Sequence, residues 1–135
     1  MAQFPSDRHC AAWAGLCPGN DDSAGKRKSG RTRKRSKWLR AALTEAAWAA
    51  SYTKSCLGAQ YHRLARRRGK KRAAVAVAHS ILIIAYHLLK DGTVYHDLGH
   101  NYFEKRDTGR LQRRLISRLE ALGLRVTVEP LPRAA

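Results

Sequence analysis

Apolar side chains recur at steps of three and four residues along most of the chain, which is the spacing of one face of an α-helix. The first predicted helix begins after Ser6, a good N-cap residue, and runs to Leu16. The segment that follows begins with turn-forming residues from Cys17 to Asp22, and a cationic surface loop is predicted from Lys26 to Lys37. The second predicted helix begins after Ser36, and one face of it is apolar: Leu39, Ala42, Leu43, Ala46, Ala47 and Ala50.

A third helix is predicted over residues 57–68, and Gly69 ends it. Its apolar stripe consists of Leu57, Tyr61, Leu64 and Ala65. Residues 70–89 are apolar on nearly every side, as in a central helix that other helices surround. Histidines and a serine interrupt this stretch, so it falls short of the ~18 uninterrupted apolar residues of a membrane-spanning helix. We therefore expect a buried core helix there, followed by a turn at Asp91 and Gly92.

The C-terminal part is predicted to hold one more helix and a short strand. The helix spans about residues 107–122, with arginines facing outward and four leucines expected to be buried: Leu111, Leu115, Leu119 and Leu122. Residues 124–129 then alternate like one short strand. The predicted fold class is mostly α: a small helical domain with a long basic loop over residues 1–106, and a C-terminal helix and tail over residues 107–135. At most one or two short strands are expected, near the C-terminus.

Composition narrows the function classes. The chain has 135 residues, a length that suits one domain, and 44% of them are hydrophobic, enough to build a core. Lysine and arginine number 27 against 10 aspartates and glutamates, which gives a formal net charge of +17. A surplus of this size predicts a polyanionic partner, either nucleic acid or an anionic membrane surface. Three irregularly spaced cysteines do not make a disulfide framework and are expected to be reduced thiols in a cytosolic protein.

Most of the positive charge is concentrated in two blocks that contain no acidic residue. The first block leads into the second predicted helix: Lys26, Arg27, Lys28, Arg31, Arg33, Lys34, Arg35, Lys37 and Arg40. The second block joins the third and fourth predicted helices, and its candidate contacts are Arg66, Arg67, Arg68, Lys70 and Lys71. Cations this close together repel one another unless phosphates neutralise them, so both blocks are candidate DNA- or RNA-binding sites. For the second block, the alternative is a solvated helix end, where arginine is common.

Ser23 lies just ahead of the first basic block, in the predicted loop. A serine hydroxyl that attacks a phosphodiester needs an exposed and adaptable backbone, phosphates held close by, and cations that offset charge on the pentacoordinate phosphorus. Residues 15–40 offer all three within a short stretch. Most loop serines have no such role, so composition alone leaves the choice between a nucleophile and a solvated serine open.

Several short motifs, in order, resemble the C-terminal domain of a known family. They are Trp13-Ala-Gly-Leu-Cys-Pro18, Ser23-Ala-Gly25, Gly30, Lys34 and Leu39-Arg40, followed by Gln60-Tyr-His-Arg-Leu64, residues 68–78 and Ala85-Tyr-His-Leu-Leu89. This family is the DEDD/serine insertion-sequence transposases, the IS-one-ten and IS-one-sixteen group, also known as bridge-RNA-guided recombinases. The resemblance covers the chain from about Phe4 to the C-terminus.

The resemblance implies a role in DNA transposition, in which Ser23 matches the serine that attacks DNA and forms a transient phosphoserine link. The implied partners are DNA, a guide RNA and further copies of the chain, at the nucleoid in the cytoplasm and without a membrane. The chain departs from the family at Arg35–Ser36, where a Gly-Asn pair is usual, and it lacks the RuvC-like domain with four acidic metal ligands. We therefore expect a truncated transposase that is inactive alone, with no cofactor of its own. A divalent metal such as Mg²⁺ is expected only in the missing domain.

Other groups of side chains receive no chemical role at this point. Residues 96–100 resemble a zinc-protease helix only superficially, because Asp97 stands where that site needs a glutamate. Four aromatic residues have the chemistry to stack on unpaired bases, but aromatics at helical spacing are usually core residues, so none is assigned: Trp38, Trp48, Tyr52 and Tyr61. The alternative function is a small, basic, non-enzymatic nucleic-acid binder of the ribosomal or nucleoid type. A decayed reading frame without a retained function is the third alternative.

Overall fold

The computed structural model describes residues 3–19, 21–32 and 34–129. This part of the chain is mostly helical, as the apolar spacing predicts, with six helices and two short strands. The chain divides into two compact units, Met1–Asn101 (unit 1) and Tyr102–Ala135 (unit 2).

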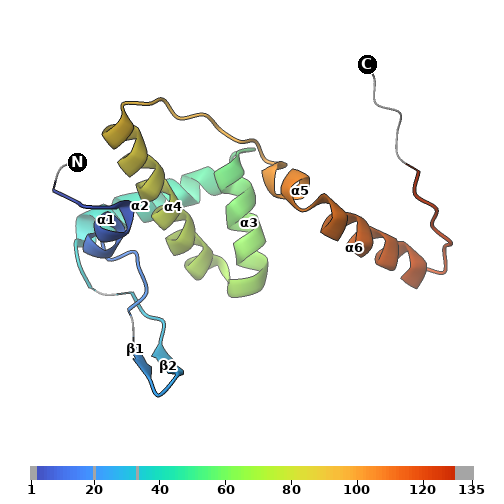
Figure 1. The fold of residues 1–135 in the computed structure, drawn as a ribbon, viewed down its shortest axis with the longest axis horizontal. Coiled ribbons are helices and arrows are strands. Elements are labelled where there is room, and N and C mark those ends of the chain that lie inside the picture. Colours follow the sequence, from blue (N-terminus) through green and yellow to red (C-terminus); the bar gives the residue numbers. More distant parts are fainter. Residues whose placement is uncertain (1–2, 20, 33, 130–135) are drawn as a thin grey trace. The chain divides into compact units, whose positions relative to one another are not determined.

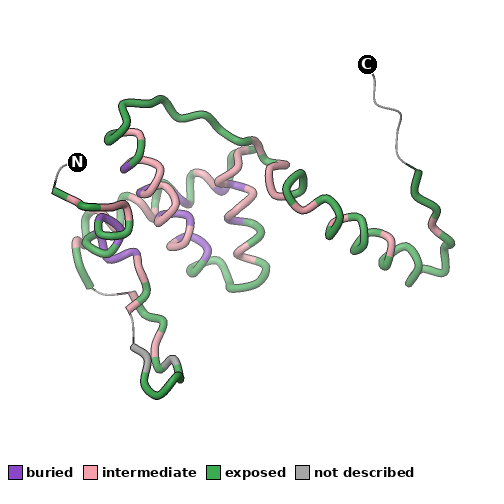
Figure 2. The backbone as a smooth tube through the Cα atoms, in the orientation of Figure 1, coloured by how far each residue is buried: buried purple, intermediate pink, exposed green. Residues whose placement is uncertain are grey.

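Unit 1 is built around one long helix (Figure 1). Its four helices are α1 (Asp7–Trp13), α2 (Lys37–Ser51), α3 (Cys56–Arg68) and α4 (Lys70–Asp91). Helix α4 packs against each of the other three, which confirms the predicted central helix. Val77 and Tyr86, both on α4, are the largest fully buried side chains. Figure 2 shows that the buried residues gather where these four helices meet.

The helix ends follow from local sequence. The hydroxyl oxygen of Ser6 accepts a hydrogen bond from the backbone N–H of His9, so Ser6 is the predicted cap of α1, although α1 ends at Trp13 rather than Leu16. Ser36 caps α2 in the same way through the backbone N–H of Leu39. Gly69, with a φ of +83°, separates α3 from α4, a conformation that glycine adopts without a steric penalty.

The prediction of a C-terminal strand is wrong. Residues 124–129 form no strand, whereas β1 (Asp21–Ser23) and β2 (Lys26–Ser29) form an antiparallel hairpin inside the predicted basic loop. The physical reason is pairing, because a strand is stable only when a neighbour accepts and donates its backbone hydrogen bonds. The strands β1 and β2 pair with each other across a tight turn.

Unit 2 contains α5 (Tyr102–Arg106) and α6 (Thr108–Ala121). The predicted burial of the leucines on the last helix is wrong. Leu111 is half-buried, but Leu115, Leu119 and Leu122 are 47%, 39% and 77% exposed. The other described helix of unit 2, α5, has only five residues and is too short to cover a stripe of this length.

Helix α4 is also long and apolar enough to cross a membrane by length and composition, a test that the core helices of soluble proteins pass as well. In this structure it contributes six residues to the core: Ala73, Ala74, Val77, Ala78, Leu82 and Tyr86.

Candidate nucleic-acid interface

The β1–β2 hairpin carries Ser23 at its tip. Ser23 is the last residue of β1 and pairs with Lys26, the first residue of β2, so Ala24 and Gly25 alone form the turn. Both turn residues have a positive φ, +50° for Ala24 and +73° for Gly25, as a two-residue type I′ turn requires. This turn keeps Ser23 and Lys26 directly opposite each other on the two strands.

On the strand that faces it, Ser23 has a cationic neighbour, whereas Asp21 and Asp22 precede it on β1. Ser23 and Lys26 are both exposed, and residues opposite each other in an antiparallel pair have Cβ atoms about 4.5–5.5 Å apart. Lys28 is exposed too, but it lies at the register shift of the hairpin, where Asp21 pairs with Ser29 and Asp22 with Arg27, so it has no pairing partner on β1. Among the groups that the structure describes, none makes a hydrogen bond with the Ser23 hydroxyl. The hydroxyl is therefore available to a ligand, opposite the residue that carries the Lys26 ammonium group.

The hairpin is fastened at its base rather than being a free loop. Pro18 and Thr32 form an isolated antiparallel bridge, and the Gly19 N–H donates a hydrogen bond of 2.8 Å to the carbonyl oxygen of Arg31. The backbone N–H of Arg31 in turn donates to the Ser29 hydroxyl oxygen at 3.2 Å. As a result, the predicted basic loop is an arm that projects from the helices (Figure 1).

The first basic block extends along this arm and into the first turns of α2. Six of its members are exposed: Lys26, Lys28, Arg31, Lys34, Arg35 and Lys37. Arg40 is half-buried on α2. The backbone of Arg27 pairs with Asp22, and its side chain is not described, whereas Arg33 lies outside the described residues.

The second basic block forms the corner between α3 and α4. Arg66, Arg67 and Arg68 are the last three residues of α3, where the helix dipole favours positive charge. Lys70 and Lys71 are the first two residues of α4, where the dipole disfavours it, and this turn has neither an acidic residue nor a side-chain cap. All five side chains are exposed. A bound anion would reduce the electrostatic repulsion among these five cationic side chains.

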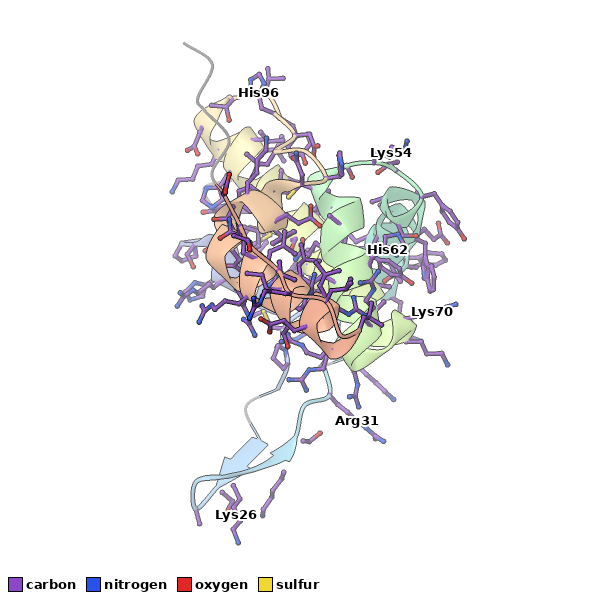
Figure 3. All side chains as sticks on the ribbon, turned by 90° about the vertical axis from the view of Figure 1, so that its right-hand side faces the viewer. Lys26, Arg31, Lys54, His62, Lys70 and His96 are labelled. Carbon is purple, nitrogen blue, oxygen red and sulfur yellow. The ribbon has the colours of Figure 1, made fainter. Side chains whose placement is uncertain are left out.

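Both blocks lie toward the same end of unit 1. In Figure 3, Lys26 marks the tip of the hairpin and Arg31 lies nearer its base. Lys70 lies at the end of the helical part from which the hairpin projects, and Figure 1 shows the α3–α4 corner at that end as well. Lys54 and His96 lie at the other end. The fold thus brings to one end two blocks that the sequence separates.

The histidine-containing loop after α4 has a structural role that sequence analysis missed. The Asp97 carboxylate accepts hydrogen bonds from the backbone N–H of Cys56 at 3.1 Å, the Tyr95 hydroxyl at 3.0 Å and the backbone N–H of Gly99 at 2.9 Å. Asp97 therefore caps α3 together with Ser55. Desolvation raises the pKa of Asp97, but these three hydrogen bonds outweigh it and leave the pKa below its ordinary value. Burial and the neighbouring Asp97 raise the pKa of Tyr95 to about 12.

The remaining thiols and carboxylates form no further centre in the described residues. Burial raises the pKa of Cys10 and Cys17, and burial together with the charge of Asp97 raises that of Cys56, so the thiolate is disfavoured at all three. In residues 3–19, 21–32 and 34–129, no three His, Cys, Asp or Glu side chains come together as a metal site would require. The residues described therefore do not fit a divalent metal, and no metal-dependent step is assigned to them.

The hairpin lies in a part of the chain that is similar to a known protein family. Residues 1–62 match the family model described as Transposase IS116/IS110/IS902 family. The match supports an IS110-family transposase region. It contains the hairpin with Ser23, and it ends within α3, before the second basic block. No curated protein and no solved structure matched the chain.

The family match indicates the process in which residues 1–62 take part. It supports DNA transposition or recombination as the general process, with DNA as the molecule acted on. A transposase family also suggests a DNA-acting protein of the cytoplasm.

Proposed function

We propose that unit 1 binds DNA through its phosphate backbone and supplies Ser23 as the nucleophile of a transposition reaction. The observation that carries the proposal is the hairpin tip, where an exposed serine stands opposite an exposed lysine inside the family-matched span. The acidic, metal-binding domain of an intact transposase would complete the site. We expect this chain alone to cleave no DNA, and the proposal assigns it no cofactor.

In the proposed step, the Ser23 Oγ attacks a backbone phosphorus. A bond forms between Oγ and phosphorus, and the bond from phosphorus to one sugar oxygen breaks. The Oγ proton passes to a base, and the departing sugar oxygen takes up a proton. Negative charge builds on the non-bridging oxygens, where Lys26 would stabilise it. Lys26 binds phosphate in this proposal and does not serve as the base.

The basic blocks hold the nucleic acid for this step. Exposed lysines and arginines neutralise phosphates and release the counterions that the nucleic acid had condensed. A guide RNA presents the same phosphate chemistry, so we include it among the proposed partners. The proposal also includes association of the chain into a homo-oligomer and its location at the nucleoid.

A binding experiment tests the role of the α3–α4 corner. The affinity of the full chain for a fluorescein-labelled DNA duplex is measured by anisotropy at several salt concentrations. We expect the logarithm of the binding constant to fall linearly with the logarithm of the salt concentration, by about 0.9 for each neutralised phosphate. Replacing Arg66, Arg67 and Arg68 with glutamine should make that slope shallower by about two to three. Affinity that does not change with salt would contradict phosphate binding.

A matched control separates a specific surface from net charge. Replacing Arg110, Arg114 and Arg118 on α6 with glutamine removes the same charge from exposed positions of unit 2. We expect a smaller change in slope than for the corner variant. Equal losses in the two triple variants would show that only total charge matters, and they would remove the second block from the interface.

The role of Ser23 needs a partner that supplies the rest of the reaction. The chain is mixed with a full-length transposase of this family whose own serine has been replaced, together with its DNA. We expect a covalent protein–DNA adduct that withstands SDS, and we expect Ser23→Ala to abolish the adduct while DNA affinity stays within twofold. Equal adduct formation by the parent chain and Ser23→Ala would show that Ser23 is not the nucleophile.

A further inference from the structure

The structure separates the aromatic side chains of α2 and α3 into two groups. Tyr61 is buried, and the Trp48 ring packs on it with the ring centroids 5.6 Å apart. Trp38 is 89% exposed and Tyr52 is 87% exposed. Packing therefore accounts for Tyr61, a core residue, and for Trp48, which is 37% exposed but rests on it, whereas Trp38 and Tyr52 are left without a structural role.

The backbone of Trp38 belongs to a helix, although its indole ring is exposed. Trp38 is the second residue of α2, two positions after the Ser36 cap, so its backbone belongs to the first turn of a regular helix. The residues three and four positions further on are Ala41 and Ala42, both exposed, and neither can cover an indole. Trp38 therefore lies at the end of α2 that adjoins the arm carrying the first basic block.

The charge around Trp38 selects the kind of partner. Its chain neighbours include exposed Arg35 and Lys37, and Arg40 follows two residues later. Residues 23–44 contain no acidic residue, and Glu45 is the first one on α2. An exposed tryptophan among cations alone is poorly suited to an equally basic protein surface, including a second copy of this chain. It is well suited to a molecule that offers both phosphates and aromatic faces.

We propose that Trp38 is a stacking platform for an unpaired base of DNA or RNA whose phosphates are bound by the first basic block. This assignment rests on the proposed nucleic-acid binding and adds to it a preference for unpaired nucleotides. Bases within a duplex already stack on their neighbours, whereas the face of an unpaired base is free to lie on an indole. Stacking of this kind tolerates every base, so no sequence preference follows from it.

The test compares unpaired and paired ligands. The full chain is titrated with labelled oligo-dT, labelled oligo-rU and a labelled DNA duplex of equal length. We expect Trp38→Ala to weaken binding to the unpaired ligands by about tenfold and to change duplex binding by less than twofold. Trp38→Phe, which keeps an aromatic ring, should recover most of the lost affinity. The salt slope should stay the same, because no phosphate contact is removed.

Tyr52→Ala is the matched control. Tyr52 is as exposed as Trp38, but it lies at the other end of α2, about 21 Å along the helix axis. We expect its replacement to leave all three affinities unchanged. Both variants should melt at the parent temperature by circular dichroism, since neither side chain is buried.

The outcomes distinguish this proposal from the one on which it rests. If the parent chain binds no nucleic acid, the proposed function fails and the stacking role fails with it. If the parent binds but Trp38→Ala binds every ligand equally well, or weakens duplex and single strand alike, only the stacking role is overturned. If Trp38→Ala abolishes self-association of the parent in sedimentation while single-strand affinity stays unchanged, Trp38 belongs to a contact between copies and the proposal is wrong.

Discussion

Asp97 shows how one residue can link segments that are far apart in sequence. Helix α3 begins without an acidic residue in its first turn, so the positive end of its dipole lacks a local partner. Asp97, 41 positions after Cys56, supplies the missing negative charge and accepts the Cys56 backbone N–H. The loop after α4 is thereby tied to the start of α3.

This contact predicts a pH dependence of stability. Because hydrogen bonds lower the folded-state pKa of Asp97, its carboxylate stabilises the fold above its unfolded pKa of about 3.9. The contribution is lost as the pH falls through the lower folded-state pKa. We expect Asp97→Asn to reduce the acid-induced drop in the urea midpoint, measured by circular dichroism between pH 6 and about pH 2.5. Glu45→Gln, at an exposed position on α2, should leave that drop unchanged, and equal curves for Asp97→Asn and the parent would refute the prediction.

Gly58 offers a second residue-level prediction. A Cβ at this position would lie 2.9 Å from the backbone carbonyl oxygen of Ala50, in the last turn of α2, and closer still to that of Thr53, just after α2. Ala is normally better than Gly in a helix by about 1 kcal/mol, but here the overpacking should dominate. We expect Gly58→Ala to destabilise the protein by about 1–3 kcal/mol in urea unfolding. The same change at Gly109 on α6 meets open space, so it should not destabilise the protein.

At the scale of elements, α4 organises unit 1 through its buried face. Its Tyr86 hydroxyl donates a hydrogen bond of 3.0 Å to the carbonyl oxygen of Phe4, which ties the N-terminal segment to the far half of α4. We expect Tyr86→Phe to lower the free energy of unfolding by about 1 kcal/mol while the circular dichroism spectrum stays unchanged.

A charge in the core should have a larger effect. Val77→Asp places an unpaired charge among the buried residues and should abolish cooperative unfolding. A Val77→Asp protein that melts like the parent would overturn the core assignment.

The elements differ in how far the sequence could predict them, and the reasons are physical. The helices of unit 1 could be predicted because each has a cap or an apolar stripe, as Ser36 and Leu39 show for α2. The hairpin could not, because its strands lack apolar alternation and Ala24 occupies a turn position where Asn or Gly is usual. A leucine stripe predicted the helix α6, but the pattern contains no information about what covers that stripe.

The candidate site was predictable only in part for the same reason. Sequence order identified Ser23 and the two basic blocks, since charge density and motif spacing are local properties. The pairing of Ser23 with Lys26 depends on the turn, and the position of the α3–α4 corner depends on helix packing. For Trp38, one signal was present: this residue falls outside the apolar face that Leu39 and Leu43 define on α2.

At the scale of the whole molecule, the buried core and both basic blocks belong to unit 1. Among the residues that the structure describes, those of the hydrophobic core lie between Cys10 and Tyr86, and α6 contributes none. Unit 2 instead presents a leucine stripe and an arginine-rich face on one amphipathic helix. Folding and nucleic-acid binding are therefore expected to depend on unit 1.

A shortened chain that ends at Asn101 tests whether unit 1 alone folds and binds nucleic acid. Because the core residues are all retained, we expect cooperative thermal unfolding within a few degrees of the parent's melting temperature, measured by circular dichroism. Both basic blocks and Trp38 are retained too, so the affinity for oligo-dT should fall by less than the tenfold loss expected for Trp38→Ala. The shortened chain with Trp38→Ala should then lose single-strand affinity by the same factor as the full chain does, because independent sites contribute additively. If the shortened chain folds but no longer binds, the interface includes the arginines of α6. If it does not fold, unit 1 needs residues 102–135 for its stability.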